Sequence, residues 1–184
     1  DLRRENPPTP VECAFVPSPV GELLLAWRPE GLCAVIMPQR GGRPAQLAAV
    51  RRNWPGRVFP ASPARLAASR KAVAFAFGKG RTPPPLLLLG TAFQLTVWRT
   101  LLSIPAGRTV TYGELAALAG QPRAVRALAG AMAANRLPLI VPCHRVVAAA
   151  GIGGYSAPGG IPRKRKLLAR EGAAQTRRPV RRTR

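Results

Sequence analysis

Acidic residues are scarce in this sequence: 7 Asp and Glu stand against 29 Lys and Arg among 184 residues, which gives a formal net charge of +22. A charge of this size raises the local concentration of a polyanion, so nucleic acid is the leading candidate partner. A charge excess kept for solubility, or an Arg-rich composition inherited from a GC-rich genome, would give the same numbers. Charge alone therefore does not decide the function.

Long apolar runs and metal-ligand clusters are also missing. No stretch approaches the roughly 18 uninterrupted apolar residues of a membrane-spanning helix, and residues 1–10 lack the apolar core of a secretory signal, so we expect a soluble, cytoplasmic protein. Three cysteines (Cys13, Cys33 and Cys143) and a single histidine do not complete the usual zinc-binding sets. We therefore expect reduced thiols, no bound metal and no cofactor.

The first half of the chain predicts a small sheet with a helix. Two apolar runs, 21–27 and 32–37, are joined by Arg28-Pro-Glu-Gly31 and indicate a β-hairpin. Residues 41–44 look like a loop. Residues 63–77 carry apolar side chains at helical spacing.

Residues 82–85 resemble a linker, and we expect an N-terminal domain at 1–85 and a C-terminal domain at 86–174. The apolar run 86–89 is a candidate last strand of the first half. The final segment, 175–184, is rich in arginine and has no acid, so we interpret it as a disordered basic tail. Such a tail either adds nonspecific phosphate affinity or has no role.

The second half predicts several helices. Residues 91–104 form the first, and its apolar face comprises Phe93, Val97, Trp98, Leu101 and Leu102. Thr111 and Glu114 are spaced as a capping box that starts a helix over 112–119, and a very short turn separates it from a helix over 122–134. The pair predicts a helix-turn-helix.

The last of these helices carries two arginines, Arg123 and Arg126, at a spacing that places them on one face. Two cations there suggest contact with DNA, although an ordinary solvated face is an equal alternative. The inner face is expected to comprise Val125, Leu128, Ala129 and Met132.

An apolar, strand-like stretch over 137–147 is interrupted by the polar residues Cys143, His144 and Arg145. A cysteine in such surroundings is most often an inert small hydrophobe, but the only histidine of the chain lies beside this one. A nucleophilic thiol needs a base, and His144 can serve. It would act directly if the chain turns here, or through a water if the strand is regular, because neighbours on a strand point to opposite faces.

A base of this kind needs a third group to orient it, and few carboxylates are available. Glu114 is committed to the capping box, so Glu171, at the end of a helical pattern over 163–171, is the better candidate. The alternative is a surface glutamate paired with Arg170 or Lys166.

Two motifs in this half carry a family resemblance. Val141-Pro-Cys-His-Arg-Val-Val147, with Thr111-Tyr-Gly-Glu-Leu-Ala-Ala-Leu-Ala-Gly120 upstream, resembles the methylated-DNA–protein-cysteine methyltransferases (O6-alkylguanine-DNA alkyltransferases), most strongly over 91–172. The resemblance implies an α/β protein of two domains: a small N-terminal sheet-plus-helix (RNase H-like) domain and a mostly helical, winged-helix-like C-terminal domain with the helix-turn-helix. It also implies direct, stoichiometric transfer of the alkyl group of O6-alkylguanine, and of O4-alkylthymine, in DNA to an internal cysteine.

By this resemblance Cys143 is the acceptor, His144 the base acting through water and Glu171 the carboxylate that orients it. Asn135 braces the turn before the active-site segment. Tyr112 turns the target nucleotide out of the duplex.

The implied partner is double-stranded alkylated DNA, bound by a monomer through the minor groove with the damaged base flipped out. The residues implied to contact DNA are Tyr112, Arg123, Ala124, Arg126 and Ala133, with Arg126 filling the space that the base leaves. The residues implied to line the pocket are Val146, Tyr155 and Ser156. The chain departs from the family at Arg136, where proline is usual, and in a longer loop at 156–160.

Two other classes fit parts of the pattern. A DNA-binding regulator would use the helix-turn-helix without chemistry, but it would not need Cys143. A cysteine hydrolase could use Cys143, His144 and Glu171 on an acyl substrate, although the net charge does not suit that function.

Overall fold

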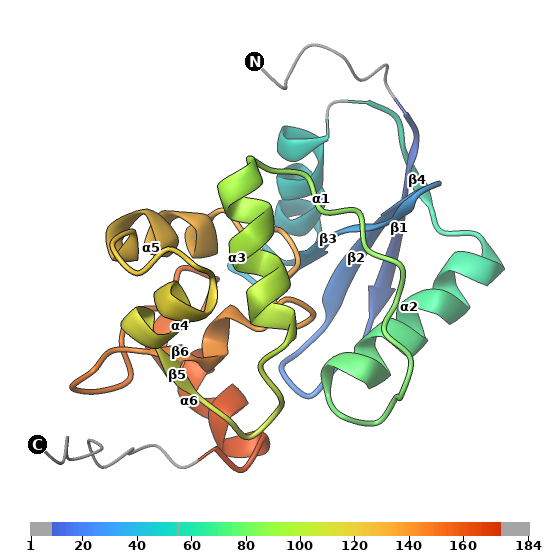
Figure 1. Cartoon of the computed structure of the whole chain (residues 1–184). Helices are drawn as coiled ribbons and strands as arrows, with labels where there is room; N and C mark the ends of the chain where they lie inside the picture. The colour runs from blue at the N-terminus through green and yellow to red at the C-terminus, as the bar shows by residue number, and fades with distance from the viewer. Residues whose placement is uncertain (1–8, 55, 174–184) are drawn as a thin grey trace, which may run out of the picture. The chain divides into compact units, whose positions relative to one another are not determined.

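The computed structural model describes residues 9–54 and 56–173 (Figure 1). The chain divides into two compact units, one ending at Leu88 and the other beginning at Leu89, close to the linker predicted at 82–85. Each unit has helices, and the first has a sheet, so the protein is of the α/β class. The basic tail predicted at 175–184 lies outside the described residues.

The first unit is built on a four-stranded sheet in the order β3-β2-β1-β4. Its strands are β1 (Val11–Val16), β2 (Leu23–Arg28), β3 (Gly31–Ile36) and β4 (Val58–Pro60). β2 pairs antiparallel with both β1 and β3, so the predicted hairpin is confirmed, whereas β4 runs parallel to β1.

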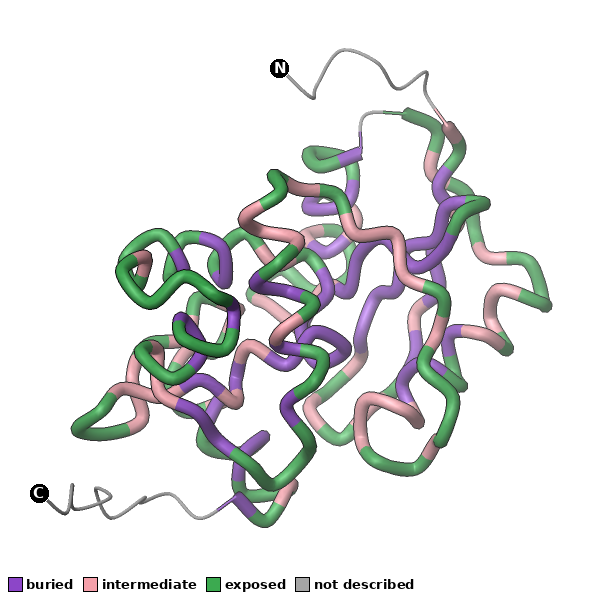
Figure 2. Tube along the Cα trace, in the orientation of Figure 1, coloured by how far each residue is buried: buried purple, intermediate pink, exposed green. Residues whose placement is uncertain are grey.

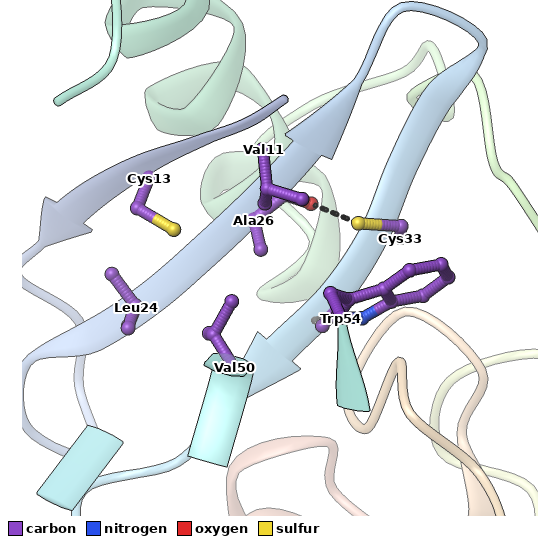
Figure 3. Packing of buried hydrophobic residues seen from close by; sticks show 8 residues of the cluster. Val11, Cys13, Leu24, Ala26, Cys33, Val50 and Trp54 are labelled. Carbon is purple, nitrogen blue, oxygen red and sulfur yellow. Dashed lines mark hydrogen bonds between the residues drawn. The ribbon is translucent and has the colours of Figure 1, made fainter. Parts of the chain in front are cut away.

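Two helices, α1 (Gly42–Asn53) and α2 (Pro63–Ala76), lie on either side of this sheet (Figure 1). Because side chains alternate along a strand, Leu24 and Ala26 of β2 pack with Val50 of α1 (Figure 3), while Trp27 turns to α2 and donates from Nε1 to Ser69 Oγ at 2.7 Å. Every residue of β2 is buried, as Figure 2 shows.

The helix predicted at 63–77 is confirmed by α2, but the loop predicted at 41–44 is wrong. Residues 42–44 form the first turn of α1. Pro44 is tolerated there because the first amides of a helix have no partner within the helix. The run 86–89 forms no strand, since Leu86 makes only an isolated bridge to Leu32.

The second unit is mostly helical. Its elements are α3 (Ala92–Leu102), β5 (Val110–Thr111), α4 (Tyr112–Leu118), α5 (Val125–Ala133), the short 3₁₀ helix η1 (Cys143–Arg145), β6 (Val146–Val147) and α6 (Gly160–Arg170). β5 and β6 pair in parallel. No helix among the described residues has both the length and the apolar character needed to cross a bilayer.

The predicted first helix of this unit is confirmed by α3, which a capping box between Thr91 and Gln94 begins. Val97, Trp98 and Leu101 are buried as expected. Leu102 is 39% exposed, so its assignment to the apolar face is wrong. Trp98 Nε1 donates to the carbonyl oxygen of Ala131 at 2.9 Å, which fixes α3 against α5.

The capping box at the start of α4 is confirmed: Glu114 N donates to Thr111 Oγ1 at 3.1 Å, and Thr111 N donates to Glu114 Oε2 at 2.7 Å. The next helix is shorter than the 122–134 predicted, because residues 122–124 form a turn and α5 begins only at Val125.

This later start corrects the predicted faces of α5. Arg123 lies in the turn and not on the helix. Val125 and Ala129 are exposed, and Ala131 joins Leu128 and Met132 on the buried face.

The strand-like stretch over 137–147 is largely turns and η1, and only β6 is extended. Pro138 and Pro142 have no amide proton to give to a sheet, and Leu139 has a positive φ of 77°. The helix predicted at 163–171 begins earlier, since α6 starts at Gly160.

Replacing Trp98 by phenylalanine should lower the free energy of unfolding of the second unit by about 1–3 kcal/mol, because the carbonyl of Ala131 would lose its buried partner. Urea denaturation followed by circular dichroism measures this loss. Leu102→Ala, on the exposed side of the same helix, is the control and should cost much less. Equal losses in the two variants would contradict the assigned role of Trp98.

Candidate active site

Cys143, His144 and Arg145 form a tight turn, which we call the reactive turn. Cys143 begins η1, and the amide of Arg145 donates to the carbonyl oxygen of Pro142 at 3.0 Å. The chain then enters β6, where Val146 pairs with Val110 and Val147 with Thr111. Because Tyr112 follows Thr111 directly, this pairing brings the start of α4 to the reactive turn.

His144 is a buried imidazole held from one side. It is 1% exposed, and its Nε2 lies 2.9 Å from Oε1 of Glu171 at the end of α6. Its other nitrogen, Nδ1, is buried and has no hydrogen-bond partner among the described residues. The contact with the carboxylate favours the tautomer with the proton on Nε2, which leaves Nδ1 as an acceptor.

Glu171 joins three segments of the second unit. Arg145 donates from Nε to both carboxylate oxygens, at 3.2 and 3.0 Å, and from Nη2 to Oε1 at 2.8 Å. The amide of Gly107 contacts Oε2 at 3.4 Å. Burial alone would raise the pKa of Glu171, but the hydrogen bonds from His144 and Arg145 lower this pKa to about 2.

This arrangement decides between the two interpretations of Glu171, as the carboxylate that orients His144 or as a surface glutamate. Its side chain is 13% exposed and contacts His144 and Arg145, so it is not a surface glutamate paired with Arg170 or Lys166. The carboxylate stays charged across the physiological pH range and can stabilise a protonated His144.

The Cys143 thiol has opposing influences. Burial raises its pKa above the ordinary value. A hydrogen bond from Asn135, the positive charge of Lys164 and the backbone amides of Cys143 and His144 act against this rise, because each favours the thiolate. The resting thiol is therefore protonated at neutral pH, and groups that stabilise the anion surround it.

Asn135 also fixes the path of the chain before the turn. Its Nδ2 donates to the carbonyl oxygen of Val141 at 3.0 Å, and its Oδ1 accepts from the amide of Leu137 at 2.9 Å. These contacts close the segment between α5 and η1, which is the position that the resemblance implied for this residue.

Two tyrosines predicted for the site lie within electrostatic reach of Cys143. Burial raises the pKa of Tyr112 and of Tyr155, and the charge of Cys143 adds to both shifts. The hydroxyl of Tyr155 is buried without a hydrogen-bond partner among the described residues. Val146 is buried beside η1, while Ser156 is exposed.

The residues predicted to contact DNA lie on the surface of the second unit. Arg123, Arg126 and Ala133 are exposed and Ala124 is partly so. Within the described residues, no hydrogen bond or ion pair joins these arginines to Cys143, His144 or Glu171.

One buried cation in the site escaped the sequence analysis. Lys164 of α6 is 0% exposed, and its Nζ donates to the carbonyl oxygens of Val146 at 2.5 Å and Gly154 at 2.9 Å. The basic residues on both sides of it in the sequence made a buried position hard to recognise. Its spacing to Leu167 and Leu168, three and four positions on, places it on the apolar face of the helix.

A partly buried cysteine, next in sequence to a buried imidazole that is bound to a carboxylate, defines a candidate cysteine-dependent site in a mostly helical unit. The family model described as "6-O-methylguanine DNA methyltransferase, DNA binding domain" matches residues 92–173. The methylated-DNA–protein-cysteine methyltransferase of Mycobacterium leprae is 36% identical over 86% of this chain and 90% of its own. The chain therefore belongs to the methylated-DNA–protein-cysteine methyltransferase family.

Similarity extends to a longer protein and to solved structures. The bifunctional transcriptional activator/DNA repair enzyme Ada of Escherichia coli is 40% identical over 88% of this chain, but the chain spans only 45% of that relative. A crystal structure of the O6-methylguanine methyltransferase of Mycobacterium tuberculosis is 34% identical with a TM-score of 0.70, covering 88% of this chain and 93% of that one. A crystal structure of the OGT protein of the same organism in complex with DNA is 35% identical with a TM-score of 0.68, covering 89% of this chain and 92% of that one.

Glu171→Gln should reduce stability by an amount that depends on pH. The folded pKa of about 2 lies below the ordinary 4.5, so the stabilisation is fully present above pH 4.5 and is lost as pH falls toward 2. We expect the variant to lose a few kcal/mol at pH 7 and to differ much less from the parent near pH 2.5. Chemical denaturation at several pH values measures this, and a pH-independent difference would contradict it.

Proposed function

We propose that this chain repairs alkylated DNA by moving the alkyl group from O6 of guanine, and from O4 of thymine, onto Sγ of Cys143. The observation that carries the proposal is the unpartnered Nδ1 of His144, next to Cys143 in sequence and anchored through its other nitrogen to Glu171. A buried imidazole with one nitrogen fixed and one free has the arrangement of a general base.

The proton of the thiol passes to His144 Nδ1 through a bridging water, and Glu171 stabilises the resulting imidazolium. The Sγ lone pair forms a bond to the alkyl carbon while the bond from that carbon to the base oxygen breaks. The bonding pair leaves with the base, and the Tyr112 phenol donates to it. The product is a thioether, and no later step cleaves it, so each chain reacts once.

The substrate is double-stranded DNA with the damaged nucleotide turned out. A thiol at this depth cannot reach a base inside a stacked duplex, so the base must leave the stack. Tyr112 turns the nucleotide out, and Arg126, exposed on α5, fills the space it leaves. The pocket that receives the base is lined by Val146, Tyr155 and Ser156.

The helices α4 and α5 form the helix-turn-helix of a winged-helix-like domain, and Arg123, Ala124 and Ala133 contact the duplex along its minor groove. The unit before it is RNase H-like. The chain acts as a monomer in the cytoplasm. Support for DNA as the partner comes from the net charge of +22 and from the relative solved in complex with DNA.

Incubation with one equivalent of duplex containing O6-methylguanine should add one methyl group to the protein, mapped to Cys143 by peptide mass analysis. Because Sγ is the only atom proposed to attack, Cys143→Ser should gain nothing. A second addition of substrate should give no further transfer. Repeated turnover on an acyl ester would instead indicate a hydrolase, and an unmodified Cys143 would refute the proposal.

Arg126→Ala should slow transfer from duplex DNA by roughly 10-fold or more, because the unstacking cost of a few kcal/mol would no longer be offset. Transfer from the same lesion in single-stranded DNA should change much less. Single-turnover rates on the two substrates measure the difference. Arg99→Ala, which removes an exposed arginine from α3, is the matched control for lost charge.

A further inference from the structure

Lys164 is a buried cation that the mechanism above does not use. It is the fifth residue of α6 and is fully buried, although moving an ammonium group out of water is energetically unfavourable. Buried charges of this kind are normally paired with an opposite charge. Its Nζ instead donates hydrogen bonds to two neutral carbonyl oxygens, those of Val146 and Gly154.

No carboxylate among the described residues of this unit is placed to pair with Lys164. The second unit contains two acidic residues, Glu114 and Glu171. Glu114 is exposed and caps α4, and Glu171 is bound to His144 and Arg145. The ammonium group therefore lies in the interior without a carboxylate as counter-ion.

The group that acts on Lys164 electrostatically is the thiol of Cys143. Of the titratable groups on the segments packed on this lysine, His144 is bound to Glu171, and Tyr155 is protonated because burial raises its pKa. Burial lowers the pKa of Lys164 to about 8, and a charge on Cys143 raises it again. In return, the positive charge of Lys164 lowers the pKa of Cys143.

We propose, on the basis of the function proposed above, that Lys164 is a positioning residue for alkyl transfer with two roles. Its ammonium group is the counter-ion of the Cys143 thiolate. It also ties the loop that carries Gly154 and Tyr155, the pocket loop, to the reactive turn. The first role follows from the position of this buried cation, because α6 packs on η1 and Nζ is bound to the carbonyl of Val146, the residue that follows η1. The second follows from its two hydrogen bonds, because Val146 directly follows η1 and Gly154 precedes the pocket tyrosine, Tyr155.

The two roles support each other. The carbonyl of Val146 holds the ammonium group near the end of η1, within electrostatic reach of Cys143. The bond to Gly154 fixes the loop that carries Tyr155 at the same time. When the proton leaves Sγ, the negative charge forms beside a cation that is already in place and needs no reorganisation.

The test compares Lys164→Met and Lys164→Gln with the full-length parent, using iodoacetamide labelling of Cys143 between pH 5.5 and 9.5 and peptide mass analysis. Labelling requires the thiolate and no DNA, so it is independent of the proposed repair activity. Methionine removes the charge and both donors at similar volume. Glutamine removes the charge and retains an amide donor. Lys166→Met, an exposed lysine two residues further along α6, is the control.

Both variants at position 164 should shift the labelling curve to higher pH by about one unit, which is ~10-fold slower labelling at pH 7. The difference from the parent should narrow above about pH 8, where Lys164 itself loses its proton. Lys166→Met should label like the parent. An unshifted curve in either folded variant would overturn the counter-ion role.

Single-turnover methyl transfer tests the second role. Lys164→Met should be slower than Lys164→Gln by more than their labelling rates differ, because only methionine also releases the loop. If the two variants differ in transfer rate by the same factor as in labelling rate, the loop role would be overturned. If neither variant folds, the labelling curve of the parent protein tests the proposal. Its labelling rate should rise less steeply between pH 8 and 9.5 than the ionisation of an isolated thiol requires. A curve that fits the ionisation of one group would overturn the proposal. A parent that labels as predicted but transfers no methyl group would refute the repair function and not the charge pairing.

Discussion

The carboxylate of Glu171 is the interaction on which the rest of the reactive unit depends. Acids are so scarce that this unit has only two, and the capping box of α4 uses the other. Glu171 must therefore serve the buried imidazole of His144 and the guanidinium of Arg145 at once. It joins the end of α6, the reactive turn and the loop at Gly107. Its loss would leave the buried imidazole of His144 and the partly buried guanidinium of Arg145 without a carboxylate.

The thiol at the centre of the site is kept protonated at rest. Burial raises the pKa of Cys143, while Asn135, Lys164 and two backbone amides act in the opposite direction. In the proposed reaction each chain reacts once, so reaction with another electrophile would waste it, and a neutral thiol is a poor nucleophile. In the proposed mechanism, ionisation depends on proton removal by His144, and the carboxylate of Glu171 stabilises the imidazolium that forms. Under that proposal, the burial that opposes ionisation of the resting thiol would also limit side reactions.

What could be predicted from the sequence was mostly local. The capping box of Thr111 and Glu114 needs only four consecutive residues, and the structure confirms it. The adjacency of Cys143 and His144 was visible, but not the turn that presents them, because two prolines interrupt an apolar run that otherwise favours a strand. The burial of Lys164 was not predicted, because a run of basic residues is typical of a solvent-exposed helix face. Its burial depends on contacts with β6 and the pocket loop, which no local pattern encodes.

The position of α6 explains how one reactive turn can lie between two opposite charges that do not cancel. Lys164 and Glu171 are seven positions apart, so they project from the same side of the helix and are separated by about 10 Å along its axis. The ammonium group acts on Cys143 and the carboxylate binds His144. In the proposed mechanism, transfer of the proton from sulfur to imidazole creates negative charge at the lysine end and positive charge at the glutamate end. One helix would then stabilise both halves of this ion pair.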